Sequence, residues 1–241
     1  MNRALVTGTL TLLSLAGCQR ETPQQTAGAN AFGVAIVDVS GEKQAAGVGA
    51  TLDQPVVVKV TDAQGNGLAG ALVQFSASGG VKFDPSSGLT GSDGQFSTAV
   101  RLGGMSGQFQ LIARTRDRQG KLLPVTFGEI ALDYQQTLGQ QLNEKYCSRC
   151  HNAESTSERV SNHDNLSVPP HPFTDGATLN QISDANLIAI ISHGGTALGK
   201  SAEMPPYTPT LSKADIGALV AYIRAVADPP YRPQGVFYAS Q

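Results

Sequence analysis

The feature that most constrains this chain is one short motif, Cys147-Ser148-Arg149-Cys150-His151. Its two thiols and the adjacent imidazole are close enough in sequence to bind one and the same group. If both thiols form thioethers to one edge of a porphyrin, the adjacent histidine can turn its ring under the iron. This spacing is the attachment signature of c-type haem. The motif therefore predicts one covalent haem c, attached at Cys147 and Cys150, with His151 as an iron ligand.

Two other uses of paired cysteines fit the rest of the sequence less well. A structural zinc site needs four ligands, usually from a second Cys or His pair, but His163, His171 and His193 show no regular pairing. A thioredoxin-like redox pair belongs to a βαβ context, which the surrounding sequence does not show. Haem attachment is therefore the favoured interpretation.

The third cysteine lies at the end of an N-terminal export signal. Residues 1–17 carry one charged side chain, Arg3, before an uncharged run that is shorter than the roughly 20 residues of a membrane span. The run ends in Leu15-Ala16-Gly17-Cys18, which resembles the lipobox of bacterial lipoproteins. The resemblance implies cleavage before Cys18 and lipidation of its thiol; an ordinary cleaved signal peptide is the alternative.

A lipid on Cys18 would anchor the mature chain to a membrane. The rest of the segment 18–31 is polar and has no periodicity, so we expect a flexible tether that reaches at most about 45 Å. Gln19 follows the cysteine, and by resemblance to enterobacterial sorting rules this favours the outer membrane over the inner. We therefore expect a periplasm-facing protein.

Residues 32–133 show short apolar runs and the period-two pattern of β-strands, separated by turn-forming residues such as Ser92-Asp93-Gly94. No stretch of this block carries a helical apolar stripe. The pattern predicts a β-sandwich of six or seven short strands. The expected strands are Gly33–Val39, Val56–Thr61, Ala71–Ala77, Phe96–Leu102, Gln108–Thr115 and Val125–Leu132.

Two segments of this block, PVVVKVTDAQGNGLAGALVQFSASGG and LTGSDGQFSTAVRLGGMSGQFQLIA, resemble the bacterial Ig-like domain of the invasin/intimin type. The block contains no Cys and no Trp, so the disulfide and the packed Trp of antibody domains are absent. It also lacks a catalytic residue pattern. We therefore favour a spacer or packing role over an adhesive or docking surface.

Residues 134–241 have the apolar spacing of an all-α domain. One helix is predicted over Gln136–Tyr146, where it leads into the cysteine motif, and another over Asp184–His193. A third begins at Ser212-Lys213-Ala214-Asp215, a capping box with Asp in place of Glu, and stops before Pro229-Pro230.

Four segments of this region, GQQLNEKYCSRCH, LIAIISHGG, EMPPY and LSKADIGALVAYIR, resemble a class I cytochrome c. The likeness covers about residues 134–228. It implies that the first and last helices cross in contact. Gly139 and Tyr222 are the candidates for that crossing, since a glycine lets another helix approach closely.

In this family a methionine thioether binds the iron opposite the histidine. The resemblance implies Met204, in the EMPPY segment, as this second ligand, because Met105 lies in a Gly-rich turn of the β block. A histidine is the alternative, His193 before His163 or His171. With both axial positions filled, O₂ and peroxide have no open site, which favours electron transfer over catalysis.

The family also uses a backbone carbonyl, usually of a proline, to accept a hydrogen bond from the Nδ1–H of the proximal histidine. Pro169 and Pro170 are the candidates in this chain. They follow a long polar stretch, residues 152–168, which departs from the commonest family pattern and to which the sequence assigns no role.

The charge balance limits the partners. The chain has 17 Lys plus Arg against 19 Asp plus Glu, which argues against a nucleic-acid-binding surface and a polybasic membrane-binding surface. Residues 134–241 contain 7 Lys plus Arg and 9 Asp plus Glu. We therefore expect transient docking to redox protein partners, with a modest dependence on salt.

The sequence thus predicts an all-β Ig-like sandwich followed by an all-α cytochrome c domain. The favoured function is a membrane-anchored, periplasmic one-electron carrier with one His–Met haem c, and not an enzyme. Two alternatives stay open. One is an electron-transfer subunit of a larger oxidoreductase complex, and the other is an adhesion or scaffold lipoprotein whose haem is structural or sensory.

Overall fold

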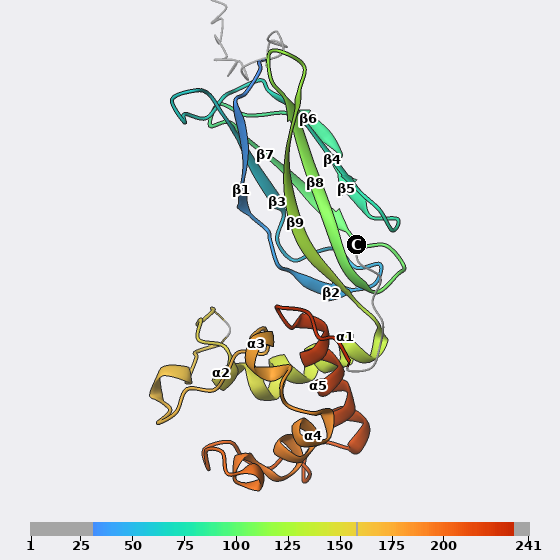
Figure 1. Cartoon of the computed structure of the whole chain (residues 1–241), viewed down its shortest axis with the longest axis vertical. Coiled ribbons are helices and arrows are strands. Elements are labelled where there is room, and N and C mark those ends of the chain that lie inside the picture. The colour runs from blue at the N-terminus through green and yellow to red at the C-terminus, as the bar shows by residue number, and fades with distance from the viewer. Residues whose placement is uncertain (1–30, 158, 234–241) are drawn as a thin grey trace, which may run out of the picture.

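The computed structural model describes residues 31–157 and 159–233. An all-β domain and a helical domain follow one another along the longest axis of the molecule (Figure 1). The predicted signal peptide, Cys18 and the tether up to residue 30 lie outside the described residues. None of the helices in the two described stretches has the length and apolar character that a membrane crossing requires.

The first domain is a sandwich of two sheets. The four-stranded sheet has the order β1 (Ala35–Ser40), β3 (Val56–Thr61), β7 (Gln95–Arg101) and β5 (Lys82–Asp84). The five-stranded sheet has the order β2 (Ala45–Gly47), β9 (Leu122–Leu132), β8 (Gly107–Arg116), β4 (Leu72–Ala77) and β6 (Ser87–Leu89). The strands pair antiparallel, apart from β2 and β9, which pair in parallel.

Alternating side chains build the core of this sandwich. In β3, Val56, Val58 and Val60 are fully buried, and the residues between them are only half-buried. The buried residues of both sheets meet in one apolar cluster. The predicted sandwich is confirmed, and each predicted strand lies within three residues of its expected bounds.

Three strands at sheet edges, β2, β5 and β6, were not predicted. Each is only three residues long, so none of them can display an alternation of apolar and polar residues. They are strands because each pairs with a longer neighbouring strand, and this pairing leaves no pattern in the sequence.

The second domain begins without a linker. The helix α1 (Tyr134–Leu142) follows β9 after a single residue, Asp133. The Asp133 carboxylate accepts from the backbone N–H of Gln136, and the Gln136 side chain accepts from the backbone N–H of Asp133. This reciprocal cap fixes the turn from strand into helix.

The remaining helical elements follow α1 along the chain. They are the π-helical turn η1 (Asn143–Cys147), α2 (Ser148–His151), η2 (His163–Asn165), α3 (Gly176–Leu179), α4 (Asp184–His193), η3 (Gly195–Leu198) and α5 (Lys213–Val226). The predicted bounds of α4 and the predicted capping box at Ser212 are confirmed. The helix predicted over Gln136–Tyr146 is present, but its second half is the π-helical turn.

The helices α1 and α5 cross in close contact at Gly139. A Cβ atom added to Gly139 would lie 2.1 Å from the carbonyl oxygen of Ala218 and 2.7 Å from Cβ of Tyr222. Only a hydrogen atom fits there, so the predicted crossing at Gly139 and Tyr222 is confirmed. The apolar sides of α4 and α5 meet in a second core beside this crossing.

The helical domain rests on the end of the sandwich where β2 and β9 lie (Figure 1). Nε2 of Gln140 in α1 donates to the carbonyl oxygen of Ala45 in β2 at 2.9 Å. Thr137 sits so close to Gly47 that an added Cβ would lie 3.1 Å from its Oγ1. The two domains therefore share a packed junction.

Candidate haem site

A cavity of about 340 Å³ opens into the helical domain. Its wall includes all four residues predicted to hold the haem, namely Cys147, Cys150, His151 and Met204. The rest of the wall is mainly apolar and comes from α3, α4, α5 and the segments between helices. The fold thus brings the motif and the methionine loop, 53 positions apart between His151 and Met204, to one cavity.

The two cysteines enter the cavity wall from the end of η1 and from α2. Both are half-buried free thiols. Burial, with a smaller contribution from Cys150, raises the pKa of Cys147 to about 12. Cys147 is therefore a protonated thiol at neutral pH. Two reduced thiols beside one apolar cavity fit the attachment of a porphyrin through thioethers.

His151 is held in the tautomer that a metal ligand needs. Its Nδ1 lies 2.8 Å from the carbonyl oxygen of His171. Because a carbonyl oxygen only accepts, Nδ1 carries the proton and Nε2 keeps its lone pair. Burial lowers the pKa of His151, and the hydrogen bond to His171, which raises it, does not compensate. The ring is therefore neutral at pH 7.

The acceptor for His151 is a correction to the sequence analysis, which named Pro169 and Pro170. Both prolines line the cavity, but the carbonyl in reach of Nδ1 belongs to His171. His171 precedes Pro172, and a residue before proline is restricted to extended backbone. A proline thus still restricts the backbone at the acceptor, but it is Pro172, the residue after the acceptor, and not the acceptor itself.

The end of α4 positions the methionine loop. This helix ends at Gly194, whose φ of 83° favours glycine. The backbone N–H of Gly195 donates to the carbonyl oxygen of Met204 at 3.0 Å. A Cβ on Gly194 would lie 2.8 Å from that same oxygen. The two glycines therefore let the loop approach closely, and Met204 packs against the core of the helical domain.

A tyrosine fixes the far end of the same loop. The hydroxyl of Tyr207 donates to the carbonyl oxygen of Tyr146 at 2.9 Å. Burial raises the pKa of Tyr207 to about 12, so the hydroxyl keeps its proton. Tyr146 directly precedes Cys147, and the loop is thereby tied to the start of the cysteine motif. No pattern in the sequence indicates this contact.

The alternative iron ligands occupy different places. His193 is exposed at the end of α4, and the histidines that line the cavity are His151 and His171. His163 lies in η2 with its Nδ1 2.9 Å from Oδ1 of Asp164. Met105 is 61% exposed in the sandwich domain. Met204 is thus the methionine that the fold brings to His151.

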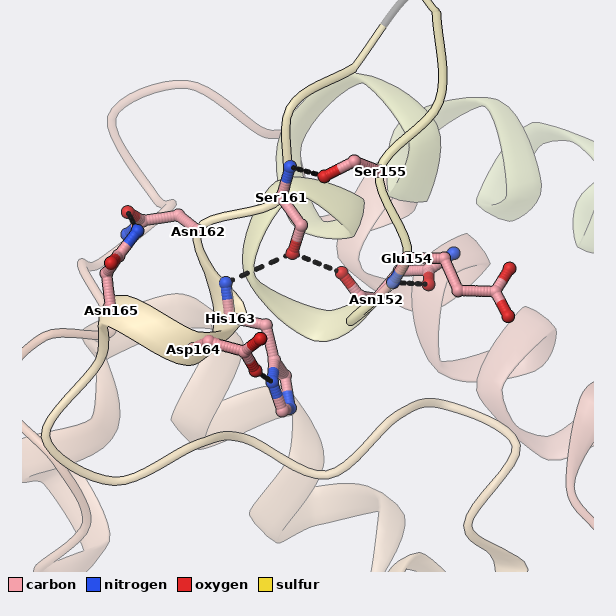
Figure 2. A network of polar contacts seen from close by, with 8 residues as sticks. All are labelled: Asn152, Glu154, Ser155, Ser161, Asn162, His163, Asp164 and Asn165. Atoms are coloured by element: carbon pink, nitrogen blue, oxygen red, sulfur yellow. Dashed lines mark hydrogen bonds and ion pairs between the residues drawn. The ribbon is translucent and has the colours of Figure 1, made fainter.

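The polar stretch after the motif folds into a network of its own (Figure 2). Ser161 lies at its centre. Its hydroxyl donates to the carbonyl oxygen of Asn152 at 2.7 Å and accepts from the backbone N–H of His163 at 3.1 Å. Its backbone N–H donates to the hydroxyl of Ser155 at 3.0 Å. The described residues of this stretch are therefore hydrogen-bonded to one another beside the site.

This network also contacts the cysteine motif directly. The backbone N–H of Asn162 donates to the carbonyl oxygen of Arg149 at 2.7 Å, and Arg159 donates to the carbonyl oxygen of Ser148 at 3.1 Å. Both acceptors belong to α2, a helix of one turn, in which the carbonyl oxygen of Ser148 also accepts from the backbone N–H of Asn152 at 3.1 Å. The stretch caps the motif.

Two family models match the chain. Residues 37–128 match the bacterial Ig-like domain (group 1), and residues 135–223 match cytochrome c oxidase, cbb3-type, subunit III. The matched ranges lie within the sandwich and the helical domain, respectively. No curated protein matches the chain.

Solved structures with similarity to the chain include intimin, InvE and invasin. The D00-D0 domain of intimin is 19% identical and aligns over 42% of this chain and 46% of its own, with a TM-score of 0.32. The Yersinia pseudotuberculosis adhesin InvE is 14% identical over 41% of this chain and 32% of its own, with a TM-score of 0.33. Invasin, a bacterial integrin-binding protein, is 19% identical over 41% of this chain and 19% of its own, with a TM-score of 0.32. The chain thus spans less than half the length of these structures.

Proposed function

Because the chain consists of a bacterial Ig-like domain followed by a cbb3-type cytochrome c domain, we propose that it is a one-electron carrier with a single covalent haem c. The observation that carries the proposal is the shared cavity wall of Cys147, Cys150, His151 and Met204. The donor set fits the group, since it offers two thiols, a neutral imidazole and a thioether.

In this proposal Cys147 and Cys150 would form the thioethers, and His151 and Met204 would bind the iron. Bound haem c supplies reversible one-electron chemistry at its iron. The Nδ1–H of His151 donates to the carbonyl oxygen of His171, which fixes the orientation of the ring. The apolar wall keeps water away from the group.

The location of the protein is a further part of the proposal. We infer that Cys18 carries the lipid anchor and that the chain faces the periplasm, with redox proteins as its partners. The cysteine count supports this, since one thiol of the three serves the anchor and two serve the haem. No thiol is then left over in an exported chain.

Visible spectra test the haem and its ligands. Residues 19–241 are exported behind a cleavable signal together with a haem-maturation system, as wild type, Met204→Ala and Met105→Ala. We expect sharp reduced c-type bands in all three proteins. The charge-transfer band of Met-ligated ferric haem should disappear in Met204→Ala alone, because Met105 is exposed in the other domain.

The outcomes separate the parts of the proposal. Loss of that band in Met105→Ala, or its persistence in Met204→Ala, contradicts ligation by Met204. A wild-type spectrum without the band moves the ligand to a histidine or leaves an open site. A chain without covalent haem contradicts the central proposal and leaves an Ig-like protein of another function.

Cell fractionation tests the anchor. The full chain and its Cys18→Ser variant are expressed, and the membrane and soluble periplasmic fractions are probed for each. We expect wild type in the membrane fraction, with a labelled fatty acid attached, and no label on the variant. Label on the variant would contradict lipidation at Cys18.

A second candidate function is that of a subunit in a larger oxidoreductase complex. The observation that favours it is the description of the matched family, a subunit of cbb3-type cytochrome c oxidase. Mild detergent extraction of native membranes distinguishes the two. Stoichiometric co-purification with an oxidase catalytic subunit supports the complex, and elution as a single chain supports the free carrier.

A further inference from the structure

The carboxylate of Glu203 joins two segments that lie far apart in the sequence. It accepts from the backbone N–H of Ser167, with Oε2 at 3.1 Å and Oε1 at 3.3 Å. The hydroxyl of Ser167 donates to Oε1 at 3.2 Å, and the hydroxyl of Ser201 donates to Oε2 at 3.2 Å. Two oxygens thus serve three donors. Ser167 belongs to the polar stretch 152–168, and Glu203 directly precedes Met204.

The contact lies at the rim of the haem cavity. Leu166 and Val168, which flank Ser167, line the cavity wall. Glu203 itself and Met204 line it as well. The polar stretch contacts the cysteine motif through Asn162 and Arg159, which donate to the carbonyl oxygens of Arg149 and Ser148. The network around Ser161 joins other residues of the stretch to one another (Figure 2). Hydrogen bonds and chain therefore connect the motif to the methionine loop across one side of the cavity.

The loop around Met204 is held on both sides. Glu203 fixes it before the methionine, and Tyr207 fixes it after the methionine. The Tyr207 side chain is half-buried and bonded to the backbone beside the motif, whereas Glu203 is exposed. A local opening starts where bonds are solvent-exposed, which makes the Glu203 side the one that opens first.

We propose that Glu203 is a positioning residue, whose carboxylate latches the methionine loop onto the stretch 152–168 and keeps Met204 at the cavity. The inference rests on the proposed His–Met haem. It gives the polar stretch a function, which is to supply the other half of the latch through Ser167.

The chemistry of the latch requires a carboxylate. A glutamine at position 203 would offer one acceptor oxygen, and its amide N–H groups cannot accept from Ser167 or Ser201. An alanine would offer none. Glu203→Gln should therefore weaken the latch, and Glu203→Ala should remove it.

Imidazole binding to the ferric, haem-loaded protein measures the opening of the loop. Imidazole takes the place of the Met204 sulfur on the iron without change of oxidation state, so at saturating imidazole the rate equals the rate of loop opening. We expect Glu203→Ala to raise this rate about tenfold, as the loss of hydrogen bonds to a charged acceptor predicts. Glu203→Gln should lie between wild type and Glu203→Ala.

Glu154→Ala is the matched control. Glu154 belongs to the same polar stretch, but its carboxylate points away from the other labelled residues of the network (Figure 2). We expect its limiting rate to stay within about twofold of wild type, which is the usual range for a substitution away from special contacts. An equal increase in Glu154→Ala and Glu203→Ala would overturn the latch.

A second variant keeps the inference testable if Glu203→Ala fails to load haem. Ser167→Ala removes one donor and should raise the limiting rate about twofold, consistent with the loss of a single hydrogen bond at an exposed site. Where both single variants load haem, their effects should not add in the double variant, since both act on one contact. Full additivity would overturn the latch.

Hydrogen exchange separates this inference from the proposed ligation. If the wild-type spectrum lacks the Met-ligation band, the His–Met proposal fails, and the latch is then judged from amide exchange in the peptide 199–207. Faster exchange of this peptide in Glu203→Ala than in wild type supports the latch whatever ligand the iron has. Unchanged exchange together with an unchanged imidazole rate overturns it.

Discussion

A buried carboxyl group in the sandwich gives the sharpest stability prediction. Glu129 on β9 is 1% exposed, and its Oε2 accepts from the backbone N–H of Gln44 at 2.8 Å. Among the described residues, its Oε1 has no hydrogen-bond partner. Burial raises the pKa of Glu129 to about 7. The hydrogen bond from Gln44 lowers this pKa, and the charge of Glu42 adds a smaller increase.

The sign of the pH effect follows from this pKa. In the unfolded chain the carboxyl titrates near 4.5, its ordinary value. Between the two values the folded chain holds a proton that the unfolded chain has released, so the free energy of unfolding falls as the pH rises. The stabilisation is complete below pH 4.5 and is lost as the pH passes 7. The difference amounts to roughly 3 kcal/mol, at about 1.4 kcal/mol per pH unit.

The Glu129→Gln variant tests this reasoning, because its amide oxygen can still accept from Gln44 but does not titrate. Urea unfolding is followed between pH 5 and pH 8 by hydrogen exchange at β8 and β9. We expect the variant to gain roughly 2–3 kcal/mol relative to wild type over this range. Asp38→Asn, at an exposed position of β1, is the control and should show no such gain. A wild-type-to-variant difference that stays constant with pH would refute the argument.

Three further substitutions test other contacts by urea unfolding of the haem-loaded chain. Gly139→Ala should destabilise the helical domain by more than about 2 kcal/mol, because the added Cβ meets a backbone carbonyl oxygen at 2.1 Å. Gly217→Ala on α5 is its control and should not destabilise the domain, because the atom nearest to the added Cβ would be 3.8 Å away. Arg224→Met should cost roughly 2–4 kcal/mol, since Arg224 is 9% exposed and donates to two backbone carbonyls; a cost below about 1 kcal/mol would contradict this. Gln140→Ala should cost about 1 kcal/mol by removing the bond to Ala45 across the domain junction, and an unchanged midpoint would show that this bond adds no stability.

The features that sequence predicted well are those that a short stretch of chain determines by itself. The capping box at Ser212 and the apolar stripe of α5 are local patterns, as is the alternation in β3. The contact of Gly139 with α5 is nonlocal, but a glycine inside a helix next to the cysteine motif is a visible local signal. The cysteine motif itself carries its chemistry in adjacent residues.

The features that sequence did not predict depend on which distant group arrives. The carbonyl that meets His151 could come from several residues near Pro170, and only the path of the chain selects His171. The contact between Glu203 and Ser167 joins exposed polar residues that carry no periodicity. Tyr207 and Tyr146 likewise meet through a side chain and a backbone carbonyl, a pairing that leaves no pattern in the sequence.

The junction between the domains decides what the Ig-like domain can do for the haem. With Asp133 as the only residue between β9 and α1, and with Gln140 bonded to β2, the two domains have no hinge of free chain between them. The chain enters the sandwich at the end away from the helical domain and leaves it at the junction (Figure 1). The 11 residues of β9 span about 37 Å at roughly 3.4 Å per residue. An anchor at Cys18 would therefore act through a stiff spacer of about that length, and the predicted tether would supply the remaining reach of the haem towards a partner.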